Sequence, residues 1–475
     1  MQQSYRSRPG WLSYLLDNSR FVIIALTLVI FFWVLSLPGP AGLSPEGLKS
    51  IAIFALCLIF WVTNVIPLMI TSLLAIILFP MMGILDANLA YSLFGNKAVF
   101  FILGAFILAS AIIRSGLSSR ITLWVLQAFG QSPKKLLLGI QVLAAFLSFW
   151  MSEHAVVAML FPIVLEIAES LNLVQGESNY GKCLFLNMGW GCVIGGIATF
   201  LGGARAPLAV GILNELTGKT IDFLPWALAA LPTVIGLLIF NYFLLNKMFP
   251  AEIKDISVAE KMLKQKLALK GKASSREKLM GILMLFTIFA WIFGGEKIGL
   301  ANIALAAVVV AFCFNLMKWK EVEEDVNWGI LLMYGGAICL GFAMDKTGAA
   351  GWLAKKVLGN LGDRPYVFLS AFALLSIFLT EVMSNSAVIA LLMPMAISLA
   401  NSFNIDPRIV TLAITIPAGL AFCLPMGTPA VAITVSSGYV ATKDTAKAGW
   451  ILNIYGWIIF TVFMIIYWPL IGFKI

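Results

Sequence analysis

A long apolar segment occurs twice in this chain, and this duplication constrains the fold more than any other feature of the sequence. The two copies, residues 147–173 and 379–405, lie 232 positions apart and keep Met, Ala, Pro and Asn at matching places. Each copy is a hydrophobic run interrupted by polar residues. The interrupting residues are Ser152, Glu153 and His154 in the first copy and Ser384, Asn385 and Ser386 in the second. The same offset pairs Gly104 with Gly336, so the two halves of the chain are predicted to be duplicates of one unit.

The composition excludes a soluble protein. Of the 475 residues, 61% are hydrophobic and only 12% are charged, and the mean hydropathy is +0.96. A water-soluble domain of this length could not cover so much apolar surface, so the chain is predicted to cross a membrane many times. The basic residues behind the net charge of +9 cluster in short segments between apolar runs, which indicates topology rather than nucleic-acid binding.

Basic residues also predict the orientation. Arg6, Arg8 and Arg20 precede the first apolar run, so the positive-inside rule places the N-terminus in the cytoplasm. The basic segment 254–278 between the two halves is expected to be a solvated cytoplasmic linker. The apolar runs predict about eleven transmembrane helices. The first half then begins inside and its duplicate begins outside, which makes the repeats inverted.

In each copy, two apolar arms flank the polar residues, and each arm is too short to cross the bilayer comfortably. A re-entrant hairpin with its polar tip inside the membrane explains both facts, because irregular backbone at that depth is tolerated where it lines a cavity. The sequence therefore predicts an all-α polytopic membrane protein with inverted repeats and two re-entrant hairpins. The glycine-rich run 183–212 and its counterpart 409–435 are expected to be broken helices beside the hairpins.

These features divide the chain into five predicted segments of a multi-pass protein in the cell's inner (plasma) membrane. Two segments hold the repeat cores and three form a scaffold around them. The segments are N-terminal scaffold helices (1–94), the first repeat core with the inward-side hairpin (95–221), scaffold helices with the basic linker (222–325), the second repeat core with the outward-side hairpin (326–442) and a C-terminal scaffold helix (443–475).

The second copy resembles a known family at its most specific positions. It carries Thr380 ahead of Ser384, Asn385 and Ser386, and then a later turn of Met426, Gly427, Thr428 and Pro429. This pattern resembles the divalent anion:sodium symporter family of di- and tricarboxylate and sulfate transporters. Typical members carry Ser-Asn-Thr in both copies, each followed by a Gly-Thr-Pro-Pro-type turn. The resemblance covers nearly the whole chain, and it implies a homodimer, Na⁺ as the co-transported ion and a small divalent or trivalent anion as substrate.

The resemblance also implies roles for residues of the second copy. A sodium ion would be held by the Thr380 hydroxyl, the Met383 carbonyl, the Asn385 side chain and the Gly427 carbonyl. The residues that would face the substrate are Ser384, Asn385, Ser386, Thr428 and Pro429. Physical chemistry agrees with both sets, because broken helices supply free carbonyl oxygens for sodium, while hydroxyl, amide and helix N-terminal N–H groups bind a carboxylate.

The first copy departs from the family pattern. Glu153 and His154 replace the Asn and Thr of the motif, and Gly-Gly-Ala-Arg at positions 202–205 replaces the later turn. A glutamate at membrane depth is costly unless it is paired, protonated or bound to a cation, and Arg205 is the available partner. The candidate substrate residues of this copy are Ser152, Glu153, His154, Gly203 and Arg205. The altered first cation site would comprise Ser148, Ser152, Glu153 and Gly202.

These residues predict a secondary active transporter of small divalent organic anions of the C4-dicarboxylate type. Arg205 stays charged at every physiological pH and His154 can add a second charge, so a tethered cation could replace a mobile sodium ion. A charged site is reluctant to change sides empty, which favours obligatory anion exchange by an elevator-type movement of the hairpin-bearing core. The alternative is sodium- or proton-coupled symport of a di- or tricarboxylate or of sulfate, because Glu153 could itself bind sodium or carry a proton.

Other classes of protein fit the sequence less well. A membrane hydrolase using Ser152 and His154 lacks an oxyanion-hole or metal signature, and a passive anion channel would need no alternating access. We expect no enzymatic activity, no organic cofactor and no nucleic-acid partner. The expected partners are a small anion, the lipid bilayer and a second copy of the chain. The six cysteines lie in apolar segments without metal-type spacing, which predicts neither a disulfide nor a metal site.

Overall fold

The computed structural model describes residues 19–358, 364–403 and 405–474, and within these ranges the chain is helical, with no β-strand. Seven helices in these ranges are long and apolar enough to cross a membrane. They are Pro45–Thr63, the interrupted helical stretch Ala87–Ser115, Phe223–Met248, Ser275–Ile298, Trp328–Lys346, Pro365–Val382 and Thr442–Ile466. The predicted class, an all-α membrane protein, is confirmed. The number of crossings, the inversion of the repeats and the re-entrant path of the hairpins stay predictions.

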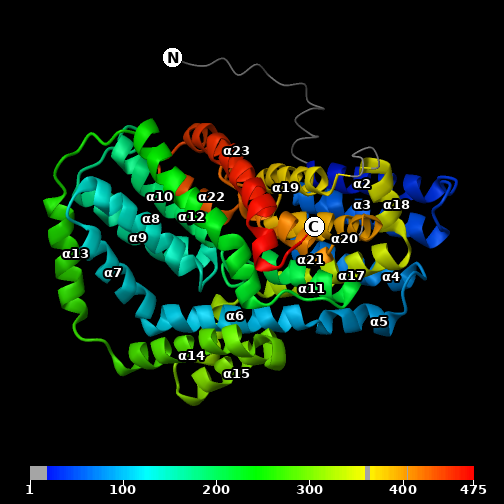
Figure 1. The fold of residues 1–475 in the computed structure, drawn as a ribbon, viewed down its shortest axis with the longest axis horizontal. Helices are drawn as coiled ribbons and strands as arrows, with labels where there is room; N and C mark the ends of the chain where they lie inside the picture. The colour runs from blue at the N-terminus through cyan, green and yellow to red at the C-terminus, as the bar shows by residue number, and fades with distance from the viewer. Residues whose placement is uncertain (1–18, 359–363, 404, 475) are drawn as a thin grey trace.

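The two repeats fold into the same series of elements (Figure 1). In the first repeat these are α6 (Lys97–Ser115), α7 (Leu117–Phe129), α8 (Pro133–Ser148), α9 (Glu153–Ser170), α10 (Asn179–Gly195) and α11 (Arg205–Thr217). The second repeat contains α17 (Trp328–Lys346), α18 (Ala349–Leu358), α19 (Pro365–Val382), α20 (Asn385–Ser402), α21 (Pro407–Thr415) and α22 (Pro429–Ser436). The second hairpin arms, α9 and α20, are both 18 residues long and begin 232 positions apart. The duplication read from the sequence is therefore visible in the structure.

The repeats lose this register after the hairpins. Arg205 and Pro429, the first residues of α11 and α22, lie 224 positions apart rather than 232. Residues 196–204 separate α10 from α11, whereas a longer break, 416–428, separates α21 from α22 and contains a 3₁₀ turn at Pro417–Gly419. Both glycine-rich runs are broken helices, as the sequence predicts, but the two breaks are built differently.

The remaining helices precede, connect and follow the repeats. They are α2 (Ser19–Ser36), α3 (Pro45–Thr63), α4 (Leu68–Met81), α5 (Ala87–Ser92), α12 (Phe223–Met248), α13 (Ser257–Lys270), α14 (Ser275–Ile298), α15 (Leu300–Cys313), α16 (Trp319–Asp325) and α23 (Thr442–Ile466), with 3₁₀ turns at Leu93–Gly95 and Trp468–Ile471. Local sequence explains several of their ends. Ser44 caps α3, which starts with Pro45, and Asn64 ends this helix with a φ of 50°. Ser274 and Glu277 form a capping box at the start of α14.

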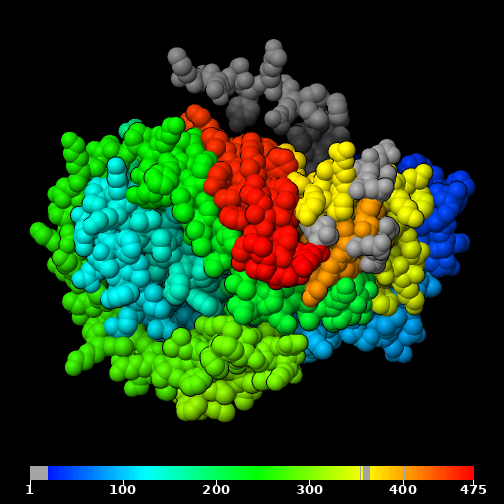
Figure 2. Space-filling model, in the orientation of Figure 1, coloured from blue at the N-terminus to red at the C-terminus, as the bar shows by residue number. Residues whose placement is uncertain are grey.

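The helices are arranged so that the two hairpins approach one interior site from different sides. In Figure 1, α8, α9 and α10 occupy the left part of the molecule, α18, α19 and α20 the right part, and α12 and α23 cross the middle. Helices α12 and α23 pack through Phe240 and Tyr455, whose rings are stacked with centroids 3.8 Å apart. Figure 2 shows the C-terminal helix on the surface of this face, above the junction of the two parts.

The basic segment between the two halves is more ordered than the sequence indicates. Its helix α13 packs against α7, and its Ala259 and Leu263 are fully buried. Arg120 of α7 donates hydrogen bonds to the carbonyls of Gly271 (2.7 Å) and Lys272 (3.1 Å), just after α13 ends. This segment is therefore partly a helix packed on α7 rather than solvated throughout, and its place as a cytoplasmic linker stays a prediction. The apolar residues recur at helical spacing, a pattern that the surrounding lysines obscure.

Candidate functional site

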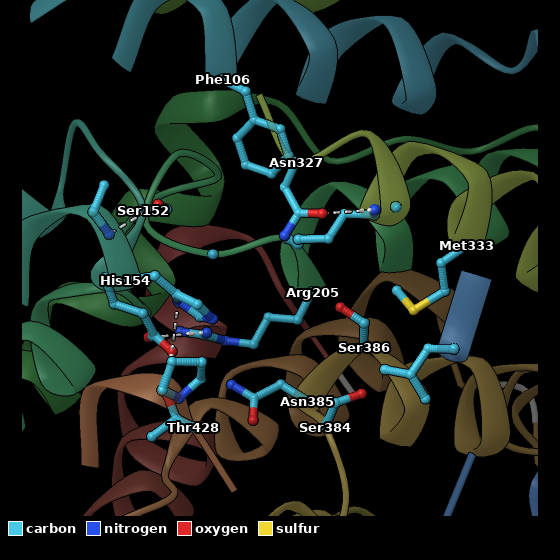
Figure 3. Close-up of a pocket in the computed structure, with 18 of the residues that line it drawn as sticks. Phe106, Ser152, His154, Arg205, Asn327, Met333, Ser384, Asn385, Ser386 and Thr428 are labelled. Carbon is cyan, nitrogen blue, oxygen red and sulfur yellow. Dashed lines mark hydrogen bonds and ion pairs between the residues drawn. The ribbon is translucent and has the colours of Figure 1, made fainter. Parts of the chain in front are cut away.

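A cavity of about 700 Å³ lies where the two hairpin tips meet (Figure 3). All ten residues that the sequence assigns to the substrate line this cavity, five from each repeat. They are Ser152, Glu153, His154, Gly203, Arg205, Ser384, Asn385, Ser386, Thr428 and Pro429. The opposite wall includes Phe106, Asn327 and Met333, for which the sequence holds no recognisable signal. Duplicated segments far apart in the chain thus share one cavity.

Each hairpin tip is shaped by a serine that caps the second arm. Ser152 is the N-cap of α9, and its hydroxyl accepts a hydrogen bond from the Ala155 N–H at 3.4 Å. Ser384 caps α20 in the same way through the Ala387 N–H at 3.3 Å. Both helices therefore begin at the cavity, where the partial positive charge of a helix N-terminus favours an anion.

Glu153 is the most deeply buried member of the site. Its side chain has no exposed surface, and its carboxylate accepts hydrogen bonds from Arg205 Nη1 at 3.3 Å and from the Thr428 hydroxyl at 2.8 Å. The Glu153 backbone N–H donates to the Gly202 carbonyl at 3.0 Å. An unpaired carboxylate in this position would be strongly unfavourable, and these contacts provide the compensation. They also join the first hairpin tip to both broken helices.

Arg205 lies between the two hairpin tips and is 3% exposed (Figure 3). Its guanidinium fits there because two neighbouring positions have no side chain. A Cβ on Gly203 would lie 2.4 Å from Nη1, and one on Gly419 would lie 2.5 Å from Nε. Within the described ranges Nη2 has no hydrogen-bond partner. The guanidinium therefore keeps a donor that is not satisfied by the protein.

Three of the residues that the resemblance implies for sodium lie together behind the second tip. One terminal atom of the Asn385 amide is 2.6 Å from Thr380 Oγ1 and 3.2 Å from the Gly427 carbonyl oxygen. The other terminal atom is 3.2 Å from Arg205 Nη1. The Thr380 hydroxyl donates a hydrogen bond to the Ala418 carbonyl at 2.8 Å. Met383, the fourth residue of this set, ends α19 and is buried.

The altered first cation set is arranged differently. Ser148 is fully buried. Gly202 approaches it closely, since a Cβ on this glycine would lie 2.6 Å from the Ser148 carbonyl oxygen. Glu153, however, directs its carboxylate toward Arg205 and Thr428. The guanidinium thus already neutralises the charge that this set would offer to a cation.

His154 lies at the edge of the charged cluster rather than within it. Its side chain is 45% exposed, and Nδ1 is 3.9 Å from Glu153 Oε1, which is beyond hydrogen-bond distance. The imidazole therefore faces the cavity as an accessible group (Figure 3).

Two carboxylates near the site were missed in the sequence. Glu381, next to Thr380, accepts hydrogen bonds of 2.9–3.1 Å from the backbone N–H groups of residues 422–424 and one of 2.6 Å from the Asn453 amide. It fixes the break that leads to Gly427. An acidic residue inside a predicted hairpin arm is the signal that could have identified it.

The second missed carboxylate, Asp325, lines the cavity at the end of α16. It accepts hydrogen bonds from Arg114 Nε (2.9 Å), Arg114 Nη2 (2.7 Å) and the Ser110 hydroxyl (2.5 Å). The hydrogen bonds from Arg114 hold the pKa of Asp325 below its usual value. Arg114 therefore fastens α16 to α6 beside the cavity.

Comparison with known proteins identifies the family. Residues 18–473 match the family described as the sodium:sulfate symporter transmembrane region. The chain belongs to this family. A relative named sodium-dependent dicarboxylate transporter SdcS, from Staphylococcus saprophyticus, is 29% identical over 484 residues, which cover 96% of this chain and 91% of the relative. The protein of the same name from Staphylococcus aureus (strain bovine RF122 / ET3-1) is 29% identical over 473 residues, covering 94% and 89%.

Solved structures of similar fold are also transporters. MtrF of Neisseria gonorrhoeae, described with a class of antimetabolite efflux pumps, superposes with a TM-score of 0.56 and 15% identity, covering 95% of this chain and 94% of its own. The YdaH transporter of Alcanivorax borkumensis gives a TM-score of 0.50 and 14% identity, covering 95% and 97%. At these identities the likeness concerns the fold alone. With the family match, it makes this protein a multi-pass membrane transporter, and the resemblance read from the motifs is confirmed.

Proposed function

We propose that the protein is a secondary active transporter that exchanges small dicarboxylates of the C4 type across the plasma membrane. The observation that carries this proposal is the buried pair of Glu153 and Arg205 at the first hairpin tip. It puts a fixed guanidinium where the family pattern implies a mobile sodium ion. The names of the SdcS relatives support the substrate class.

The cavity offers donors suited to carboxylates at both hairpin tips. On one side are the N-terminus of α9, the Arg205 guanidinium and the imidazole of His154. On the other side are the N-terminus of α20 and the Ser386 hydroxyl. A dianion with a carboxylate at each end would satisfy both sets, and charge-assisted hydrogen bonds of this kind are the strong ones.

The same donors explain why exchange is favoured over net movement. In the empty site Glu153 and Asn385 use only part of the hydrogen-bonding capacity of the Arg205 guanidinium, which is costly for a buried charge inside a membrane protein. A bound dianion supplies the missing acceptors, so the loaded core moves and the empty one does not. We propose that the hairpin-bearing core moves in an elevator-type step against the other helices, in a homodimer with a cytoplasmic N-terminus.

Cation-coupled symport is the second candidate, and a specific observation favours it. The Thr380 hydroxyl oxygen and the Gly427 carbonyl oxygen lie 2.6 and 3.2 Å from one terminal atom of the Asn385 amide at the second tip. Neutral oxygens from a hairpin and a broken helix are the ligands that sodium takes in such transporters. The SdcS relatives are named sodium-dependent.

The test is uptake of labelled succinate, malate, citrate and sulfate by proteoliposomes, with and without internal substrate and with and without an inward sodium or proton gradient. Exchange predicts succinate or malate uptake only after preloading. Concentrative uptake into substrate-free liposomes, driven by either gradient, would refute exchange. Absence of substrate counterflow into preloaded liposomes would instead indicate a channel.

A further inference from the structure

A single amide side chain, that of Asn385, lies between the guanidinium of the first repeat and the oxygens of the second. One terminal atom contacts Thr380 Oγ1 at 2.6 Å and the Gly427 carbonyl oxygen at 3.2 Å, and the other contacts Arg205 Nη1 at 3.2 Å. An amide has one oxygen, which accepts, and one nitrogen, which donates. The two sides of Asn385 therefore cannot both receive its oxygen.

When the amide nitrogen faces Thr380, both ends of the Asn385 amide have partners. The nitrogen donates to Thr380 Oγ1 and to the Gly427 carbonyl, and the amide oxygen accepts from Arg205 Nη1. The Thr380 hydroxyl has one hydrogen, which it donates to the Ala418 carbonyl. This arrangement needs no cation.

When the amide oxygen faces Thr380, three oxygens converge on one point with at most one hydrogen between them. A cation among these oxygens would relieve their repulsion, and neutral side-chain and carbonyl oxygens are suitable ligands for sodium. The amide nitrogen then points at Arg205 Nη1, so that two donors face each other at 3.2 Å. The positive charge of the guanidinium would also repel the ion across the amide.

We propose that Arg205 and a sodium ion at the second hairpin compete for the oxygen of Asn385, so that Arg205 lowers the sodium affinity of this site. Glu153 maintains the competition because its carboxylate holds Nη1 in place at 3.3 Å. The arginine by which the first repeat departs from the family pattern thus weakens ion binding at the second repeat. This inference rests on the transport function proposed above, since it concerns the same site and the ion that the alternative mechanism would carry.

The experiment measures sodium binding without transport. The full-length protein in detergent is heated at increasing NaCl, with choline chloride keeping the ionic strength constant and no substrate present. We expect the sodium concentration that gives half of the stabilisation to fall at least tenfold in Arg205→Gln relative to the unmodified protein. The matched control is Arg408→Gln, which removes an arginine of the second repeat that pairs with Asp406 and does not line the cavity. We expect it to leave the sodium response unchanged.

A double-mutant cycle assigns the effect to the amide. Asn385→Ala should abolish the gain produced by Arg205→Gln, because the contested oxygen is gone. An equal sodium response in the unmodified protein and in Arg205→Gln would overturn the proposal, and so would an undiminished gain in the Asn385→Ala background.

Arg205→Gln alone leaves Glu153 buried without a cationic partner and is at risk of failing to fold. The double variant Glu153→Gln with Arg205→Gln removes both charges together and carries the same expectation of a tenfold gain. Because no transport is measured, a finding of symport in liposomes would refute the exchange mechanism while leaving this competition intact. Conversely, an unchanged sodium response would refute the competition while leaving exchange untouched.

Discussion

The two hairpin tips share a backbone and differ in their side chains. Ser152 and Ser384 cap their helices with nearly equal dihedral angles, φ/ψ of −60°/140° and −63°/143°, and both following helices contain 18 residues. Beyond the caps, the first tip continues with a buried carboxylate and a partly exposed imidazole, whereas the second continues with an amide and a hydroxyl. Duplication thus preserved the capping geometry while the chemistry at the tips diverged.

The difference shows that the two tips operate as one site. The charged residues of the first tip pair with each other and also depend on the second repeat, since Glu153 accepts from Thr428, and Arg205 reaches Asn385. The buried carboxylate of the second repeat does not depend on the first repeat in this way. Glu381 accepts hydrogen bonds from the backbone of its own broken helix and from Asn453. Changes at the first tip should therefore affect the second tip more than the reverse.

The largest effect is expected from removing the charge that links the tips. Arg205→Ala leaves Glu153 buried with no cationic partner, which typically costs about 3–5 kcal/mol of stability. We expect uptake to fall more than about a hundredfold, as for other losses of several kcal/mol at a binding site. Thermal unfolding in detergent and uptake by proteoliposomes measure the two effects.

The control is Glu153→Gln combined with Arg205→Ala. It should recover much of the stability, since no buried charge remains unpaired, without restoring transport. Uptake by Arg205→Ala within about threefold of the unmodified protein would show that the first tip does not contact substrate.

A smaller loss is expected at the second tip. Asn385→Ala and Thr428→Ala each remove a donor to a charged group or an ion ligand, and such hydrogen bonds are worth about 1.5–3 kcal/mol. We expect uptake to fall about 10- to 100-fold, with each protein still folded in the membrane. Thr428→Ser keeps the hydroxyl that Glu153 accepts and should retain most of the activity. Near-normal uptake in both alanine variants would disprove the site assignment.

The sequence predicted which residues share one cavity better than it predicted the contacts between them. The offset of 232 positions and the paired polar motif identified ten residues that line one cavity, because a duplicated motif fixes which segments must meet. They could not show that Glu153 bonds to Thr428, since such contacts depend on how the two halves pack. Nor could they show the shift from 232 to 224 positions between the broken helices, because the longer break has no fixed sequence pattern.

Charged residues outside the motif were interpreted least accurately. Glu381 sits in an apolar run with no periodic signal, and its partners are backbone N–H groups of residues that are distant in sequence. The packing of helix α13 on α7 was not predicted, because its many lysines hide a narrow apolar face. In both cases the deciding interaction is tertiary, which local sequence does not encode.

The inverted relation of the repeats can be tested by labelling from each side of the membrane. Single cysteines are placed at Gln131, just after α7, and at Lys356, in α18, which is the counterpart of α7 in the second repeat. Gly362, a second position suited to this test, lies outside the described residues. Exposed Cys313 is first replaced by serine. A membrane-impermeant maleimide should then label one of the two cysteines at least about tenfold faster from one side of the membrane, and the other cysteine at least about tenfold faster from the opposite side. Labelling of both positions from one side would refute the inversion.

The smallest effect is expected from replacing Arg114, which pairs with Asp325 beside the cavity. Comparing it with Arg205 measures how much the burial of an ion pair matters. Arg114 binds Asp325 at 2.7 Å, but both side chains are partly exposed, at 36% and 26%. Ion pairs of this kind contribute about 0–1 kcal/mol, so Arg114→Ala should lower the free energy of unfolding by less than about 1 kcal/mol and uptake by no more than about threefold.

The ion pair of Arg114 and Asp325 should also respond to pH in a defined direction. The folded pKa of Asp325 is lowered by Arg114, so its stabilisation is complete above the unfolded value of about 3.9 and is lost as the pH falls through the folded value. The stability difference between the unmodified protein and Arg114→Ala should therefore be greatest near neutral pH and shrink below about pH 4. Thermal unfolding of both proteins at neutral and acidic pH measures this difference. A difference as large in acid as at neutral pH would mean that Arg114 acts by packing rather than by charge, and a loss of uptake as severe as that of Arg205→Ala would mean that burial does not distinguish the two arginines.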